Sequence, residues 1–234
     1  MLLTENDIRK IVKECVRHII CEKLGFIDEK LFQLGTLIYQ ETAKVFSNKK
    51  IKAKITISKN IVAQYYPYSN PSEINILIED NMGGKKIEYK NKTLFVNILL
   101  FKESKQSIIA KIIHELTHFV NDNEGTIRTR NIIVSDMLKD VNRLIYFLRD
   151  TERNARCSEF AYYLKNETKI RPIEYYEAIT HIKEIEGLIY HTYIFKLFIK
   201  KRYKISFEHL EKQFEKYKQK IFKIYHFFLS LKNE

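Results

Sequence analysis

Residues 104–120 read SKQSIIAKIIHELTHFV, and the interpretation of the whole chain starts from this stretch. Its apolar residues recur every three or four positions, which is the period of an amphipathic helix. They are Ile109, Ile112, Ile113, Leu116 and Val120. Ser104 and Ser107 are candidate N-caps. The sequence therefore predicts a helix of about 15 residues, with two His and one Glu on its polar face.

The polar face of this helix holds an H-E-x-x-H motif, His114-Glu115-Leu116-Thr117-His118. Positions i and i+4 of a helix lie one above the other, so His114 and His118 can direct both imidazoles at one metal ion. Glu115 lies about 100° around the helix from His114. From there its carboxylate can reach a metal-bound water without being a ligand. This is the arrangement for metal-assisted hydrolysis.

A third ligand is expected downstream, because a catalytic zinc takes three protein ligands and leaves its fourth position to water. Residues 151–164, TERNARCSEFAYYL, predict a second amphipathic helix. Glu152, Ala155 and Glu159 share one face of it. A small residue at position 155 lets this helix approach the first closely. Glu152 and Glu159 are therefore both candidates for the third ligand.

The two motifs resemble those of the zincin metallopeptidases. The closer resemblance is to the gluzincin type, whose third ligand is the Glu of an E-x-x-A or E-x-x-S motif on a following helix. It covers approximately residues 93–164. The resemblance implies a Zn²⁺ ion held by His114, His118 and Glu152, with Glu115 as the general base. It also implies a protein or peptide substrate.

Other variants of the family pattern fit less well. The thermolysin-like N-E-x-x-S-D motif has an Asp four residues after the ligand Glu, where this chain has Arg156. The intracellular, phage-associated peptidases that cleave repressors are similar in having E-x-x-A followed by a Phe-Ala pair, present here as Phe160-Ala161 at a displaced position. The metzincin pattern fails because Asn121 replaces its turn Gly and Glu124 its third His.

Peptide hydrolysis also needs a hydrogen-bond donor at the oxyanion of the tetrahedral intermediate. In related enzymes this donor is a Tyr, His or Arg. The candidates here are Tyr162, Tyr163, Arg156 and His181, and spacing alone does not choose among them. We take the two tyrosines of the predicted ligand helix, Tyr162 and Tyr163, as catalytic candidates.

Length and composition favour one domain over residues 1–234. The chain is 45% hydrophobic, and only three Pro and six Gly leave no obvious linker. We expect an α+β fold with an N-terminal helical hairpin (1–48), a zincin-like core (49–165) and a helical extension (166–234). No apolar run reaches the length of a membrane span, and the N-terminus does not read as a signal peptide. We therefore expect a cytoplasmic protein without a membrane partner.

The remaining periodicities predict a small, mainly antiparallel sheet between helical segments. Helices are expected from Thr4 to Gly25, from Asp28 to Ser47, within 127–147, from Pro172 to about Lys201, and from Ser206 to about Leu231. Strands are expected at 51–57, 74–78, 85–89 and 93–101, with a turn at Met82-Gly83-Gly84. In zincins such a sheet precedes the H-E-x-x-H helix, and one strand pairs with an extended substrate.

The formal net charge of +12 raises a different class of function. A basic surface gains affinity for nucleic acid by releasing counterions from phosphates. The Lys residues are spread along the chain, however, and form no single block. The alternatives to a zinc metallopeptidase are a basic nucleic-acid-binding or scaffolding protein with a vestigial H-E-x-x-H, and a peptidase that acts on a DNA-bound protein such as a repressor.

The three cysteines predict neither a disulfide framework nor a Cys-rich zinc site. Cys15, Cys21 and Cys157 are odd in number and lack C-x-x-C spacing. We expect Cys157, which lies on the predicted ligand helix, to be a small buried apolar residue.

Overall fold

A computed structural model describes residues 28–47, 53–65, 72–80, 82, 86–123 and 139–232. The expected first helix lies outside these residues, so only the second helix of the expected N-terminal hairpin (1–48) is described. The two glycines of the expected turn at 82–84 also lie outside them.

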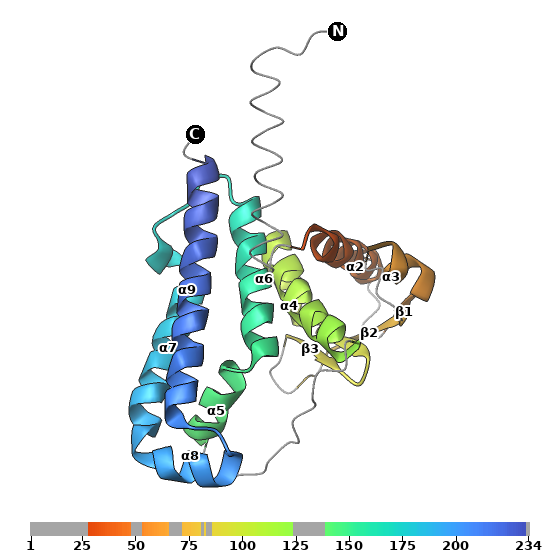
Figure 1. Ribbon diagram of the computed structural model, residues 1–234. Coiled ribbons are helices and arrows are strands. Elements are labelled where there is room, and N and C mark those ends of the chain that lie inside the picture. The colour runs from red at the N-terminus through yellow and green to blue at the C-terminus, as the bar shows by residue number, and fades with distance from the viewer. Residues whose placement is uncertain are drawn as a thin grey trace.

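The described chain is mostly helical, with one small sheet (Figure 1). Its strands are β1 (Ala53–Ile57), β2 (Ile74–Glu79), β3 (Ile87–Lys90) and β4 (Thr93–Asn97). Its α-helices are α2 (Glu29–Ser47), α3 (Lys59–Tyr65), α4 (Lys105–Asn123), α5 (Lys139–Phe147), α6 (Asp150–Asn166), α7 (Glu177–Thr192), α8 (Lys196–Tyr203) and α9 (Phe207–Lys232). Short 3-10 helices are η1 (Ile98–Lys102), η3 (Ile173–Tyr175) and η4 (Tyr193–Phe195). The expected α+β fold class is confirmed.

The sheet is mixed, with strand order β1-β2-β4-β3. β1 pairs with β2 and β3 with β4 in antiparallel fashion, while β2 and β4 are parallel. A two-residue turn joins β3 to β4, and both of its residues have positive φ, 50° at Asn91 and 60° at Lys92. Such a turn matches the twist of the flanking strands. It leaves β3 at one edge of the sheet.

The register of β3 decides which of its backbone groups face outward. Asn97 N donates to Lys86 O at 2.8 Å, and Lys86 and Asn97 extend the β3–β4 register by one pair. Hydrogen-bonded and non-hydrogen-bonded pairs alternate along antiparallel strands. The backbone groups of Ile87 and Tyr89 therefore point away from β4, toward the outer edge of the sheet.

α4 is the central helix of the molecule (Figure 1). It contacts β3 and α2 on one side and α6 on the other, and α6 in turn contacts α9. The buried apolar side chains form one cluster that extends from the sheet through α4 and α6 to α7 and α9. Gly35 of α2 allows a close approach to α4, because a Cβ at this position would lie 2.7 Å from Ile113 Cγ1.

Polar contacts fix the start of α4. Ser104 Oγ accepts a hydrogen bond from Ser107 N at 3.2 Å, so Ser104 is the N-cap. The Ser107 hydroxyl instead donates to Glu103, which also pairs with Lys86 and Lys111. Burial acts to raise the pKa of Glu103, but these three partners outweigh it and lower the pKa to about 2.

Two predicted elements end earlier than expected. The strand expected to reach residue 101 ends at Asn97, whose Oδ1 accepts from Leu99 N at 2.9 Å and starts η1. Asn side chains compete with regular backbone pairing in this way. The helix expected from Pro172 to Lys201 is divided into η3, α7, η4 and α8. α7 ends at Thr192, where the N–H of Tyr193 bonds to Tyr190 O and η4 begins.

The other helices lie closer to the ranges expected from the sequence. α3 was not expected from the sequence, whereas α2, α6 and α9 match their expected ranges within two residues at each end. Cys157 is fully buried, as expected. In the part of the chain that the structure describes, no helix is long and apolar enough to span a bilayer.

Candidate metal centre

The candidate centre lies between α4 and α6, which run antiparallel side by side. Gln106 Nε2 donates to Asn166 O at 3.2 Å at one end of the pair. At the other end, His118 Nε2 lies 3.3 Å from Glu152 Oε2. This packing brings together His114, His118 and Glu152, and one ligand atom from each lies within 4.8 Å of the others.

The separations within this cluster fit a tetrahedral zinc ion. The two imidazole Nε2 atoms are 3.3 Å apart, and Glu152 oxygens lie 3.3 Å from His118 Nε2 and 3.7 Å from His114 Nε2. With metal–ligand bonds of about 2.0–2.1 Å, ligand atoms on a tetrahedral zinc are about 3.3–3.4 Å apart. Glu152 Oε2 is buried and has no hydrogen-bond partner. Burying a carboxylate oxygen in this way is costly unless a cation satisfies it.

Glu159 determines which nitrogen of His114 is available to a metal. Glu159 Oε2 lies 3.2 Å from His114 Nδ1. An ionised carboxylate can only accept, so Nδ1 carries a proton. Although burial acts to lower it, Glu152 and Glu159 raise the pKa of His114 to about 10, so a metal ion bound at Nε2 would take the place of the second proton of the ring. Metal-binding His residues commonly donate their second nitrogen to a carboxylate in this way. Glu159, the alternative ligand in the sequence, thus lies on the opposite side of the ring from the cluster.

Arg156 links the two carboxylates of α6. Its Nε donates to Glu152 Oε1 at 3.0 Å, and its Nη1 lies 3.6 Å from Glu159 Oε2. Burial would raise the pKa of both carboxyl groups, but the nearby histidines and the charge of Arg156 lower the pKa of each. Both side chains are therefore anionic. Arg156, an oxyanion candidate in the sequence, has its guanidinium committed to these carboxylates.

Glu115 faces the outer edge of β3. Its Oε2 accepts from Tyr89 N at 2.7 Å, one of the backbone groups that point away from β4. Burial raises the pKa of Glu115, although the charges of His114 and His118 and the Tyr89 N–H act in the opposite direction. The H-E-x-x-H glutamate thus lies beside the strand that an extended chain could join.

Neither Tyr162 nor Tyr163 is brought to the cluster. The Tyr162 side chain faces α2, where its ring packs edge-on against Phe32 and its hydroxyl lies near Thr36. The Tyr163 hydroxyl lies near Ser107. Ser107 is two turns, about 10 Å, along α4 from His114. Tyr162 and Tyr163 lie about three turns along α6 from Glu152. They are neighbouring positions of the helix and therefore point in different directions.

A residue that sequence reasoning missed, Tyr146, does reach the cluster. Its hydroxyl lies near the Glu152 carboxylate, while the residue remains 43% exposed. Burial of the hydroxyl and the negative charge of Glu152 raise the pKa of Tyr146, so it stays a protonated donor. The Arg149 guanidinium lies over the ring, 5.6 Å from its centroid. Tyr146 belongs to α5. The helix is interrupted between α5 and α6, and this interruption turns the Tyr146 side chain toward Glu152.

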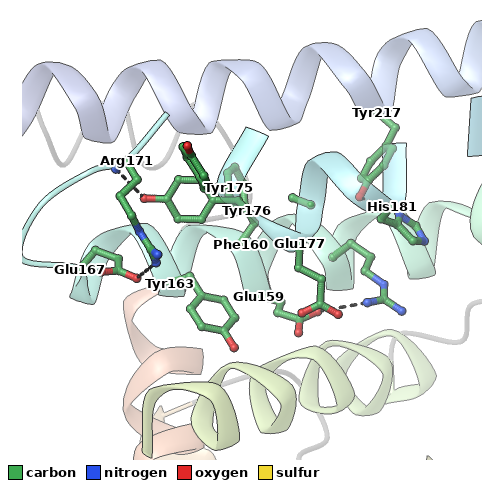
Figure 2. Close-up of a pocket in the computed structure, with 12 residues that line it drawn as sticks. Glu159, Phe160, Tyr163, Glu167, Arg171, Tyr175, Tyr176, Glu177, His181 and Tyr217 are labelled. Carbon is green, nitrogen blue, oxygen red and sulfur yellow. Dashed lines mark hydrogen bonds and ion pairs between the residues drawn. The ribbon is translucent and has the colours of Figure 1, made fainter. Parts of the chain in front are cut away.

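A cavity of about 190 Å³ lies on the Glu159 side of the centre (Figure 2). Arg156, Glu159, Tyr163 and His181 contribute to its lining. His181 Nδ1 lies 3.3 Å from Tyr217 Oη. Burial and the nearby charge of Arg156 lower the pKa of His181 to about 4, so this His is neutral at pH 7. His181 therefore belongs to the cavity and is not part of the ligand cluster.

Comparisons of the chain with protein-family models, with curated proteins and with solved structures found no significant match. Only the geometry of the centre therefore indicates what the protein does.

Proposed function

We propose that this protein is a zinc-dependent metallopeptidase that hydrolyses protein or peptide substrates. The observation that carries the proposal is that His114 Nε2 and His118 Nε2 lie 3.3 Å apart, with oxygens of the buried Glu152 carboxylate 3.7 Å and 3.3 Å from them. Glu115 lies beside this cluster, and Glu159 orients His114 from behind. Two imidazoles and one carboxylate suit zinc in a site that keeps one position open.

A bound zinc ion would lower the pKa of its water to about 7 and polarise a peptide carbonyl. Glu115 accepts the proton of the attacking water and passes it to the leaving amine. The raised pKa of Glu115 suits this exchange, because a base that also serves as an acid works best with a pKa near the working pH.

Tyr146 is the best-placed donor for the negative charge that develops on the carbonyl oxygen. Its hydroxyl lies near the Glu152 carboxylate, and its raised pKa keeps the proton available. A donor fixed before the reaction stabilises the transition state without reorganisation. We assign this role to Tyr146 in place of Tyr162 and Tyr163.

The position of β3 supports an extended peptide as substrate. A peptide that adds to a sheet edge gains affinity from backbone hydrogen bonds, and the side chains around it give selectivity. The outward-facing backbone groups of Ile87 belong to such an edge, and the neighbouring Tyr89 N donates to Glu115. A substrate aligned there has its backbone beside Glu115.

The first test is metal content and hydrolysis with the full chain. Protein purified without added metal should hold one zinc per chain by elemental analysis, and His114→Ala/His118→Ala should hold none. Glu115→Gln should keep zinc and lose cleavage of a quenched fluorescent peptide library, because an amide cannot accept the proton.

Glu186→Gln is the matched control, since this glutamate is exposed on α7. It should retain both zinc and cleavage. Stoichiometric zinc in the double His variant would place the metal elsewhere. Wild-type cleavage by Glu115→Gln would rule out the mechanism, and a chain without zinc would favour the nucleic-acid-binding or scaffolding alternative.

A further inference from the structure

A second polar groove lies between α6 and α9, about 420 Å³ in volume. Its lining residues carry mostly positive charge or amide groups, and they are Asp150, Arg153, Gln213, Lys216, Gln219, Lys220 and Lys223. Asp150 is their only carboxylate. The groove is on the α9 side of α6, whereas the metal-ligand candidates of α6 face α4.

Arg153 forms the buried floor of this groove. It is 5% exposed, donates through Nη1 to Gln213 O at 3.3 Å, and pairs through Nη2 with Asp150. Its Nε is buried and has no hydrogen-bond partner. A buried, unsatisfied guanidinium donor is costly, so this group favours an acceptor that enters the groove.

Three lysines of α9 form the wall of the groove. Lys216, Lys220 and Lys223 follow one another at i, i+4 and i+7, a row about 10 Å long on one helix face. Lys220 donates to Asn154 Oδ1 at 3.3 Å. Lys216 and Lys223 make no ion pair with any residue that the structure describes. The positive end of the α6 dipole lies here as well, and the N-cap Arg149 makes no side-chain cap bond.

The chemistry of the lining identifies the kind of anion. Lys, Arg and Gln side chains are the usual donors to phosphate oxygens in nucleic-acid complexes. No aromatic side chain lines the groove, and surfaces for single strands rely on aromatic stacking of the bases. The lining therefore fits the sugar-phosphate backbone of a duplex.

We propose that the α6–α9 groove binds the phosphate backbone of double-stranded nucleic acid, without base-specific contacts. The groove and the metal centre occupy opposite sides of α6, so one chain can hold a duplex and a polypeptide substrate together. The proposal does not depend on the metal centre, because the groove residues and their contacts are separate from it.

The test is fluorescence anisotropy of a labelled random-sequence 20-bp DNA duplex, titrated with the full chain at several salt concentrations. Each phosphate contact contributes about −0.9 to the slope of log K against log salt. The variant Lys216→Gln/Lys220→Gln/Lys223→Gln should bind more than ten-fold more weakly, and its slope should be shallower by about 2.7. The control Lys183→Gln/Lys200→Gln/Lys201→Gln removes three exposed lysines elsewhere and should keep the wild-type slope.

A variant that should gain affinity for the duplex tests the groove independently. Asp150→Asn removes the only carboxylate of the groove and frees Arg153, so it should bind the duplex several-fold more tightly. Asp140→Asn, an exposed aspartate of α5, makes the same change in net charge and should not. Circular dichroism establishes that each variant is folded.

Three results would overturn the proposal. One is absence of duplex binding at 50 mM salt. Another is equal loss in both triple-lysine variants, which would mean that overall charge alone causes binding. The third is a poly-glutamate peptide that binds as tightly as the duplex with the same lysine dependence. That result would assign the groove to acidic polypeptides.

Discussion

At the residue scale, the centre depends on two carboxylates of α6 that have different partners. Glu152 presents an unpartnered oxygen to the Nε2 side of the histidines, and Glu159 binds Nδ1 of His114. The H-E-x-x-H group could be predicted because its spacing is local to one helix. The separate positions of Glu152 and Glu159 depend on how α6 packs against α4. This packing could not be predicted from the sequence.

Glu152→Ala and Glu159→Ala should therefore lower zinc affinity by different amounts. Loss of Glu152 removes a ligand and leaves two histidines, so we expect a loss of about a thousand-fold or more, beyond the roughly 10–100-fold that loss of an outer partner costs. Glu159→Ala should fall within that smaller range. Zinc titration against a competing chelator measures both. If Glu159→Ala loses the metal and Glu152→Ala keeps it, the assignments must be exchanged.

Tyr146→Phe tests the donor that only the structure identified. We expect kcat to fall about 100- to 1,000-fold, the usual cost of removing one oxyanion donor. Zinc affinity and KM should change little, because the aromatic ring remains. Tyr190→Phe on α7, which is 81% exposed, is the control and should leave kcat unchanged. An unaltered kcat in Tyr146→Phe would remove this residue from the mechanism.

At the element scale, the long amphipathic helices could be predicted and the interruptions could not. α4 follows a 3.6-residue apolar period, which is visible in the sequence. α6 was expected to be amphipathic as well, but it buries charged and apolar side chains on all sides. The end of β4 at Asn97 depends on a single side-chain bond to the backbone, and α7 passes into η4 through a local backbone bond from Tyr193 N to Tyr190 O. Such bonds compete with regular structure and leave no periodic signal.

Two glycine substitutions should have opposite effects on stability. Gly35→Ala places a Cβ 2.7 Å from Ile113 Cγ1, next to the first metal-ligand candidate of α4, and should cost about 1–3 kcal/mol through overpacking. Gly187→Ala meets no atom within 4 Å in the middle of α7 and should gain about 0.5–1 kcal/mol. Urea unfolding measures both. Equal effects would mean that the α2–α4 contact is not close.

The bonds around Glu103 should make the stability of the α4 start depend on pH. The pKa of Glu103 is lowered to about 2, so its contribution is complete above its unfolded pKa and is lost as pH falls toward 2. Glu103→Gln should lower stability at pH 7 by about 1 kcal/mol, allowing for solvent screening. Thermal unfolding at several pH values should show this difference shrinking below about pH 4.5. A difference that is independent of pH would contradict an ionic origin.

At the scale of the whole molecule, the candidate centre joins two parts of the core. Besides one another, α4 contacts β3 and α2, while α6 contacts α9 and α5. The sequence predicted the order of a small sheet, the H-E-x-x-H helix and a ligand helix. It did not predict that β2 pairs with β4 in parallel, because the choice between possible strand neighbours depends on tertiary packing.

Removal of metal should therefore destabilise the whole fold. A ligand at 100 times its Kd stabilises the native state by about 2.7 kcal/mol. For a chain of this length, 1 kcal/mol corresponds to about 2–4 °C in Tm, so EDTA should lower the Tm of the zinc-loaded protein by about 5–10 °C. His114→Ala/His118→Ala should show no response to EDTA, because its α4 carries neither imidazole. An EDTA response in that variant would show that a metal stabilises the fold from another site.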